Sequence, residues 1–208
     1  MSVAYGKDQR LLELASIAAF VLLSAWGLWR LGAATLVYFP LVLLAAAPAG
    51  WLAADLLSGL AHWAFDSFGS VGTPLIGESF IRPFRAHHAD PQEMTRHDFV
   101  ETHGASCFAA LPLLAAASLL SLDSRAGILW QALLLFTALG ALATNQCHKW
   151  AHMDEEQTPR LIAWAQRHRL VLPREHHRLH HMPPFDTHFC MSSGWLNAPF
   201  NALLQRWR

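Results

Sequence analysis

Residues 126–148, AGILWQALLLFTALGALATNQCH, are the stretch that decides the fold. Residues 126–147 contain no charged side chain, and roughly 20 apolar residues of helix are enough to cross the hydrocarbon core of a bilayer. The apolar run ends at His148, and a second histidine, His152, follows four residues later. This stretch therefore predicts a membrane-spanning helix that carries a pair of histidines at one end.

Three other segments have the same apolar character. Hydrophobic residues make up 53% of the chain and charged residues 14%, against about 25% charged residues in ordinary soluble domains. We therefore predict an all-α integral membrane protein with four transmembrane helices in one domain covering residues 1–208. The predicted spans are residues 11–30, 33–62, 103–122 and 126–148.

The connections between the spans fix the expected topology. Only a few residues separate the first span from the second and the third from the fourth, so the loop 64–101 and the tail 149–208 must share one side with the N-terminus. That side carries every Lys and Arg except Arg30 and Arg125. The positive-inside rule then places both termini in the cytoplasm, at the inner membrane of a bacterium or the endoplasmic reticulum of a eukaryote.

All thirteen histidines fall on the same predicted side. Because the topology was assigned from charge and hydropathy, the position of the histidines is an independent observation. It predicts a cytoplasmic, histidine-rich cap of short helices and loops. A net charge of zero argues against a nucleic-acid partner, and three widely separated cysteines exclude a disulfide scaffold or a thiolate metal site.

Several of the histidines recur at helical spacing. His148 and His152, His176 and His180, and His177 and His181 are each four residues apart, which places both rings of a pair on one helix face. The prolines at 173 and 183 bracket a short helix around the last two pairs. The candidate metal ligands are His62, His87, His88, His97, His148, His152, His176, His177, His180 and His181.

Ten imidazoles are too many for one metal ion, because a zinc ion takes three or four protein ligands. Two metal ions sharing this set fit better, and imidazole suits iron, copper and zinc alike. Adjacent His87 and His88 are not expected to bind one metal together, so one of them is predicted to support a ligand. His103, His168 and His188 are interpreted as surface residues and are left out of the set.

Charged residues near the histidines have two predicted roles. Asp55, Asp66 and Asp98 are expected to orient ligand imidazoles or to bind metal themselves. Arg82, Arg85, Arg174 and Arg178 are candidates for binding a phosphate group. No catalytic residue beyond the metal site is predicted.

Longer blocks around the histidines resemble a known family. The blocks are FIRPFRAHHADP at 80–91, TRHDFVET at 95–102, TNQCHKWAHM at 144–153 and LVLPREHHRLHHMPPFDTHFCMSSGWLNAPF at 170–200. They are similar to the plasmanylethanolamine desaturase family of membrane lipid desaturases, and the resemblance runs from about residue 53 to residue 200. His103 and His188 depart from the family pattern, in which Asn and an aromatic residue are expected.

The resemblance implies a reaction. Members of the family hold two iron ions, use O2 as co-substrate and convert the sn-1 O-alkyl chain of an ether phospholipid to the vinyl ether of a plasmalogen. They take electrons from an external donor, which the resemblance suggests is cytochrome b5-like, and a ferredoxin would suit a bacterial host. No haem-attachment or dinucleotide-binding motif is present to supply electrons from this chain itself.

Other functions remain open at this point. The same histidines would serve a desaturase or hydroxylase that acts on a phospholipid fatty-acyl chain. A non-catalytic membrane metal-binding protein or a membrane haem protein would also use paired histidines. Transport sites lie near the middle of the bilayer, whereas these histidines are predicted to gather at one surface, which disfavours a metal carrier.

Overall fold

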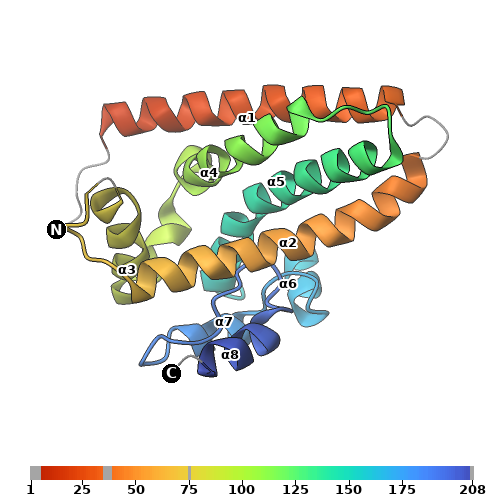
Figure 1. Cartoon of the computed structure of the whole chain (residues 1–208). Coiled ribbons are helices and arrows are strands. Elements are labelled where there is room, and N and C mark those ends of the chain that lie inside the picture. The colour runs from red at the N-terminus through yellow and green to blue at the C-terminus, as the bar shows by residue number, and fades with distance from the viewer. Residues whose placement is uncertain (1–5, 35–38, 75, 207–208) are drawn as a thin grey trace. The chain divides into compact units, whose positions relative to one another are not determined.

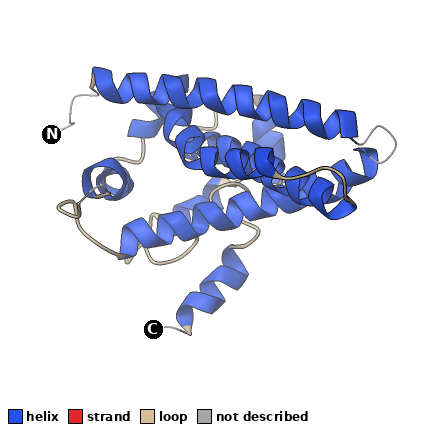
Figure 2. Ribbon diagram, turned by 45° about the horizontal axis from the view of Figure 1, so that its top comes forward, coloured by secondary structure: helices blue, strands red, loops and turns tan. Residues whose placement is uncertain are grey.

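The computed structural model describes residues 6–34, 39–74 and 76–206. Helices and loops make up these residues, and no strand occurs among them (Figure 2). The elements, in chain order, are α1 (Lys7–Ala34), α2 (Phe39–Ser67), η1 (Gly77–Ile81), α3 (Arg82–Ala89), η2 (Glu93–Arg96), α4 (Phe99–Leu119), α5 (Arg125–His152), α6 (Arg160–Arg167), α7 (Arg174–His180) and α8 (Asn197–Gln205) (Figure 1).

The four predicted spans are confirmed as the four long helices α1, α2, α4 and α5. Each has a stretch long and apolar enough to cross a membrane, and leucines on them stay largely exposed, including Leu22, Leu44 and Leu119. Exposed leucine on a long apolar helix is what contact with lipid requires. The second predicted span includes residues 35–38, which lie outside the described residues, and α2 begins at Phe39.

Two compact units divide the chain between them. The first comprises Met1–Ala54 and Asp98–Asn145, and the second comprises Asp55–His97 and Gln146–Arg208. Helices α2 and α5 each contribute residues to both units.

The first unit is a packed set of helices with an apolar core. Phe20, Leu114 and Leu135 are almost fully buried in its core. At Gly50 on α2, an added Cβ would lie 2.6 Å from the Cβ of Phe136, so only glycine permits this approach to α5. The Gln131 amide, also on α5, donates to the Gly27 carbonyl of α1 at 3.0 Å. This bond gives the amide N–H an internal partner where water is excluded.

Two residues near the start of α4 behave differently from the sequence interpretation. Asp98 caps the N-terminus of α4, accepting from the main chain of Val100 and Glu101, and it pairs with Arg10 at 2.7 Å. His103 is only 5% exposed, and its Nδ1 lies 3.2 Å from the Leu142 carbonyl oxygen. The interpretation of His103 as a surface residue is therefore wrong, because the first turns of α4 pack against α5.

The second unit contains the short helices and the ends of α2 and α5. Its core is formed by Phe189, Cys190, Phe200 and Leu204, with Trp63 packed against them. The predicted short helix between the two prolines is confirmed as α7, which begins directly after Pro173. The cytoplasmic location of these short helices stays a prediction, as does the single domain over residues 1–208.

Candidate metal centre

Nine side chains of the second unit converge in two groups. In each group the potential ligand atoms all lie within 4.8 Å of one another. The five-histidine group consists of His87, His148, His152, His177 and His181. The mixed group consists of His62, Asp66, His88 and His180.

The five-histidine group has the spacing of ligands around one cation. The Nε2 atoms of His148, His152 and His177 form a triangle with sides of 2.9, 3.2 and 2.7 Å, and Nε2 of His181 lies 3.1 Å from that of His177. Nitrogens about 2.1 Å from a shared metal ion lie about 3.0–3.4 Å apart in octahedral or tetrahedral geometry. Three N–H groups cannot satisfy one another in so small a triangle, so a shared cation explains the convergence better than hydrogen bonds.

The mixed group is arranged around one carboxylate oxygen. Oδ2 of Asp66 lies 3.1 Å from Nε2 of His88, 3.4 Å from Nε2 of His62 and 3.6 Å from Nε2 of His180. Nε2 of His180 in turn lies 3.0 Å from Nε2 of His62. His62 and His180 are buried, and Asp66 is only 7% exposed in its side chain. This group therefore offers three imidazole nitrogens and one carboxylate.

Four helices supply the groups, and helical spacing decides which residues meet. His62 and Asp66 lie one turn apart on α2, and His148 and His152 one turn apart on α5. His87 and His88 come from α3, whereas the remaining three histidines come from α7 and the residue that follows it. His87 belongs to the five-histidine group and His88 to the mixed group. The adjacent pair thus reaches two neighbouring groups, so neither histidine needs to be confined to a supporting role.

The two groups lie side by side. Ring centroids are 5.0 Å apart for His88 and His181, 5.7 Å for His177 and His180, and 5.8 Å for His62 and His148. These pairs each join one group to the other. The arrangement is suited to two metal ions in one continuous site.

Surrounding groups orient the imidazoles and limit access of water. Nδ1 of His180 lies 2.8 Å from the Thr187 carbonyl oxygen, so it donates there and leaves Nε2 to face the group. Phe84 packs edge-on against His62, Phe185 against His88 and Phe189 against His180. Spacing rules gave no signal for these aromatic residues or for Thr187, because the contacts depend on how the loops fold back.

Burial keeps the histidines outside the spans in the form that binds metal. It lowers the pKa of His87 to about 2, of His180 to about 3 and of His181 to about 4, and neighbouring imidazoles lower these pKa values further. The pKa of buried His177 falls well below its ordinary value for the same reasons. These imidazoles are neutral near pH 7, and neutral imidazole is the metal ligand.

Four of the sequence-predicted residues lie outside both groups. His176 faces away from its neighbour His177, and its Nε2 accepts from the buried Asn197 amide at 3.0 Å. Burial lowers the pKa of His176, and the charges of His188 and Arg169 lower it further. His97 belongs to neither group, although its carbonyl accepts from Lys149 Nζ at 2.5 Å. Asp98 is the helix cap described above.

Asp55 is the fourth, and it holds a loop rather than an imidazole. Its Oδ1 accepts from the main-chain N–H groups of Ser192 at 2.8 Å and Ser193 at 3.0 Å, and its Oδ2 accepts from the Ser193 hydroxyl at 3.0 Å. The Ser192 carbonyl accepts from the N–H of Leu172 just before α7. Asp55 is fully buried, so it ties the segment leading into α7 to α2.

The candidate phosphate-binding arginines have internal partners where contacts are described. The Arg85 guanidinium donates to the carbonyls of Phe65, Phe68 and Gly69 at the end of α2, which caps that helix. Arg174 donates to the Thr158 hydroxyl at 2.5 Å. Arg82 is half-buried and Arg178 is exposed. A phosphate role for these four residues stays a prediction.

The donor set fits a transition metal such as iron. Nitrogen-rich sites with one carboxylate suit iron, zinc or copper, whereas magnesium and calcium prefer oxygen ligands. Within the described residues, Nε2 of His87 and Oδ1 of Asp66 are buried and have no hydrogen-bond partner. A buried polar atom without a partner is energetically costly, and a bound cation would give these two atoms a partner.

The fold and the site together are those of an integral membrane protein with a histidine-rich candidate metal centre. Residues 51–208 match the lipid desaturase domain. The chain therefore belongs to the lipid desaturase family, a family of metal-dependent oxidoreductases, which confirms the resemblance drawn from the histidine blocks. No solved structure matches this chain.

Three curated relatives place the chain within the family. It is 40% identical over 199 residues to plasmanylethanolamine desaturase of Myxococcus xanthus, covering 96% of this chain and 70% of that protein. It is 43% identical over 169 residues to plasmanylethanolamine desaturase 1 of Mus musculus, covering 79% of this chain and 62% of the mouse protein, less than two thirds of its length. It is 33% identical over 152 residues to the chloroplastic fatty acid desaturase 4 of Arabidopsis thaliana, covering 72% and 45%.

Proposed function

We propose that this protein converts the sn-1 O-alkyl chain of plasmanylethanolamine, an ether phospholipid, to the 1-alkenyl vinyl ether of a plasmalogen. The observation that carries the proposal is the convergence of eight histidines and Asp66 in two groups, in a chain 40% identical to a relative named for this reaction. The lower identity to the chloroplastic fatty acid desaturase favours the ether lipid over a fatty-acyl chain. A single desaturase domain over residues 1–208 is part of the proposal.

The proposed reaction removes one hydrogen from C1 and one from C2 of the alkyl chain. One O2, two electrons from a donor and two protons from solvent combine with the two hydrogens to give two waters and the new double bond. Side chains cannot oxidise an unactivated C–H bond, and two iron ions, one in each group, would supply that oxidising chemistry when bound. The nine residues of the two groups are the proposed ligands.

The chain's own residues position and protect this chemistry. Neutral His87, His177 and His181 present nitrogen lone pairs inward, and the Thr187 carbonyl fixes the orientation of His180. The rings of Phe84 and Phe185 cover neighbouring imidazoles and exclude water from them. His97, His176 and Asp98 have no part in the proposed ligand set.

The electrons are proposed to come from an external protein. A cytochrome b5-like protein or a ferredoxin is the proposed donor, and the excess of Lys and Arg on the predicted cytoplasmic side would attract an acidic protein. Both termini are proposed to lie in the cytoplasm. The membrane is proposed to be the inner membrane of a bacterium or, in a eukaryote, the endoplasmic reticulum.

A lipid assay tests the proposed function. The chain is expressed in cells that lack plasmalogens and are fed an alkylglycerol precursor, and acid-labile vinyl ethers are measured by mass spectrometry. Vinyl ethers are expected with the natural chain and not with His177→Ala, whereas His168→Ala, at an exposed histidine outside both groups, should retain them. Absence of vinyl ethers despite alkyl lipid, bound iron and a competent donor would contradict the proposal and direct attention to fatty-acyl products.

A further inference from the structure

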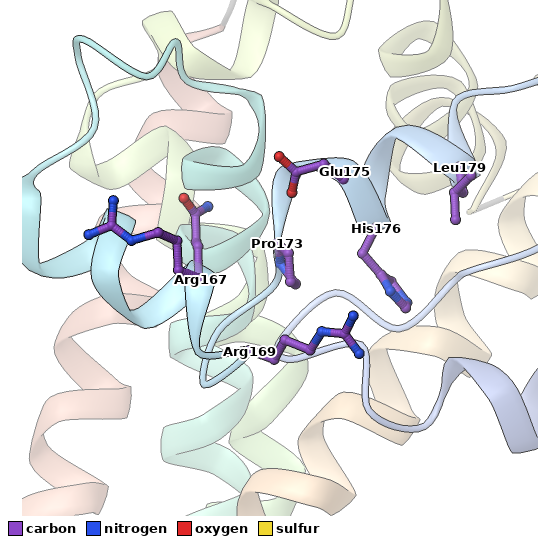
Figure 3. Close-up of a pocket in the computed structure, with 7 residues that line it drawn as sticks. Arg167, Arg169, Pro173, Glu175, His176 and Leu179 are labelled. Carbon is purple, nitrogen blue, oxygen red and sulfur yellow. The ribbon is translucent and has the colours of Figure 1, made fainter.

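A hollow in the second unit lies apart from the metal groups. It has a volume of about 410 Å³ and lies between α6, the turn after it and α7 (Figure 3). Volumes of this size are typical of small-molecule sites, roughly 300–1,000 Å³. The residues that line it are Gln166, Arg167, Arg169, Pro173, Glu175, His176 and Leu179.

The hollow uses the face of α7 opposite the metal ligands. Glu175, His176 and Leu179 fall on one side of the helix, because residues three and four apart share a face. The ligand histidines of α7 fall on the other side. The hollow is therefore not part of the nine-residue site, and a molecule bound in it would be separated from that site by the thickness of a helix.

Arg169 occupies a backbone position that favours glycine. It has a φ of 55°, and its N–H and that of Leu170 donate to the carbonyls of Gln166 and Ala165 at the end of α6. This pattern is the Schellman motif, whose left-handed residue is usually glycine. An arginine there is conformationally unfavourable. Its presence therefore indicates a functional role for the side chain. Figure 3 shows that the Arg169 guanidinium lies in the hollow, facing the His176 ring.

The charges around the hollow complement a zwitterion. Arg169 supplies a guanidinium group and Glu175 a carboxylate, and within the described residues neither charged group has a hydrogen-bond or ion-pair partner. The Arg167 side chain also lines the hollow but points away from Arg169 (Figure 3). Guanidinium binds phosphate oxygens through charge-assisted hydrogen bonds, and a carboxylate can accept from a primary ammonium group. The hollow therefore offers partners for both charges of phosphoethanolamine.

Exposed apolar residues lie in and next to the hollow. Leu179, which lines it, is 43% exposed, and Leu170, the neighbour of Arg169 in the chain, is 44% exposed. Trp195 is 50% exposed, and its indole N–H donates to the Arg169 carbonyl. Exposed tryptophan and leucine beside basic residues are typical of surfaces that contact the membrane interface. These apolar residues favour a lipid over a soluble anion as the ligand.

We propose that the hollow between α6 and α7 binds the phosphoethanolamine head of a membrane phospholipid, with Arg169 on the phosphate and Glu175 on the ammonium. The choice of ethanolamine deepens the proposed function, since the proposed substrate carries the same head. Because the hollow lies on the far face of α7 from the metal ligands, it recognises the head and not the sn-1 linkage. Alkyl and diacyl lipids should therefore bind equally.

Binding to the purified, metal-loaded full chain in detergent tests the proposal without requiring turnover. The probes are dihexanoyl phosphatidylethanolamine, its 1-alkyl analogue, the choline and glycerol counterparts and inorganic phosphate. The key variant is Arg169→Gly, which suits the left-handed backbone and should unfold at the same or a higher temperature. It is expected to lower affinity for the ethanolamine lipid about tenfold, the effect of losing a charge-assisted hydrogen bond.

Two further variants complete the design. Glu175→Gln is expected to abolish the preference for ethanolamine over choline, and Arg160→Gln, at an exposed arginine that does not line the hollow, should bind like the natural chain. Unchanged binding by Arg169→Gly would overturn the proposal. So would equal loss in Arg160→Gln, competition by inorganic phosphate as strong as that by the lipid, or a strong preference for the alkyl analogue. Because no turnover is measured, failure here is distinguishable from failure of the proposed reaction.

Discussion

Replacing the two adjacent histidines of α3, one at a time, tests whether the nine residues bind two separate ions. His87→Ala leaves four imidazoles in the five-histidine group, and His88→Ala leaves two imidazoles and Asp66 in the mixed group. The substitutions are matched, since both positions are half-buried on the same short helix and alanine favours helix. Each variant should therefore lose affinity at one group only.

The expected loss can be bounded. Removing a residue that merely supports a ligand costs 10–100-fold in metal affinity, so removing a ligand should cost at least about 100-fold, or about 2.7 kcal/mol. The mixed group keeps fewer donors after substitution, so His88→Ala should have the larger effect. At a buffered metal concentration about tenfold above the natural dissociation constants, the natural chain should hold two ions and each variant about one.

Metal analysis after equilibration against a chelator gives the stoichiometry, and the visible spectrum of the cobalt-substituted protein identifies which group is filled. His87→Ala should keep the signal of the group that includes a carboxylate, and His88→Ala that of the nitrogen-only group. The double variant should bind neither ion. Two separate metal sites would be excluded if both single variants lost the same cobalt signal, or if either variant retained both ions at that metal concentration.

Three further predictions follow from single contacts. His176→Ala should keep both metal ions, because the His176 ring contacts Asn197 and not a metal group. His177→Ala should lose one ion. An equal loss of metal from both variants would contradict the faces of α7 assigned to these two residues. Asp55→Asn should cost about 1.5–3 kcal/mol through weaker charge-assisted bonds to residues 192–193, seen as a lower unfolding temperature; an unchanged temperature would sink it. The metal-free protein should lose stability as pH falls below about 6.5, the ordinary pKa of histidine. Below that pH the unfolded imidazoles take up protons, whereas in the folded protein the pKa values of His87, His180 and His181 are about 2, 3 and 4. An unfolding temperature that stays constant between about pH 7.5 and 4.5 would contradict a neutral histidine cluster.

The membrane helices could be predicted because the bilayer imposes a simple rule. A spanning helix must be long and apolar to satisfy its backbone without water, and the four runs obey that rule with ends within a few residues of α1, α2, α4 and α5. The exact first and last residues of these helices could not be predicted, because local capping contacts determine where a helix begins and ends. Asp98 starts α4 four residues before the predicted span, through contacts with Val100 and Glu101.

Helical spacing predicted much of the candidate site. His148 with His152, His177 with His181 and His62 with Asp66 each meet as the four-residue interval implies. The same four-residue interval wrongly predicted that His176 and His180 lie in one group: His180 belongs to the mixed group and His176 to neither. Helix α7 turns its 177, 180 and 181 positions toward the other helices, and this places His176 on the opposite face with Asn197. Which face of a short amphipathic helix turns inward depends on its partners, and one sequence does not reveal them.

The remaining contacts lie in loops and depend on tertiary folding. Asp55 was predicted to orient an imidazole or bind metal, yet its partners are the main chain of Ser192 and both the main chain and the hydroxyl of Ser193, 137 and 138 residues away in sequence. No local pattern announces such a contact. Arg169 likewise looks like an ordinary basic residue until its left-handed backbone is known.

The proposed desaturation of the alkyl chain is best tested by following the atoms of substrate and O2 through a single turnover. The purified, iron-loaded protein is given reduced electron donor, ¹⁸O₂ and an ether phospholipid deuterated at C1 and C2 of the alkyl chain. We expect a vinyl ether that has lost one deuterium from each carbon and gained no ¹⁸O, with the ¹⁸O label recovered in water. A product carrying ¹⁸O, loss of hydrogen from a fatty-acyl chain instead, or no reaction with both metal groups filled would contradict it.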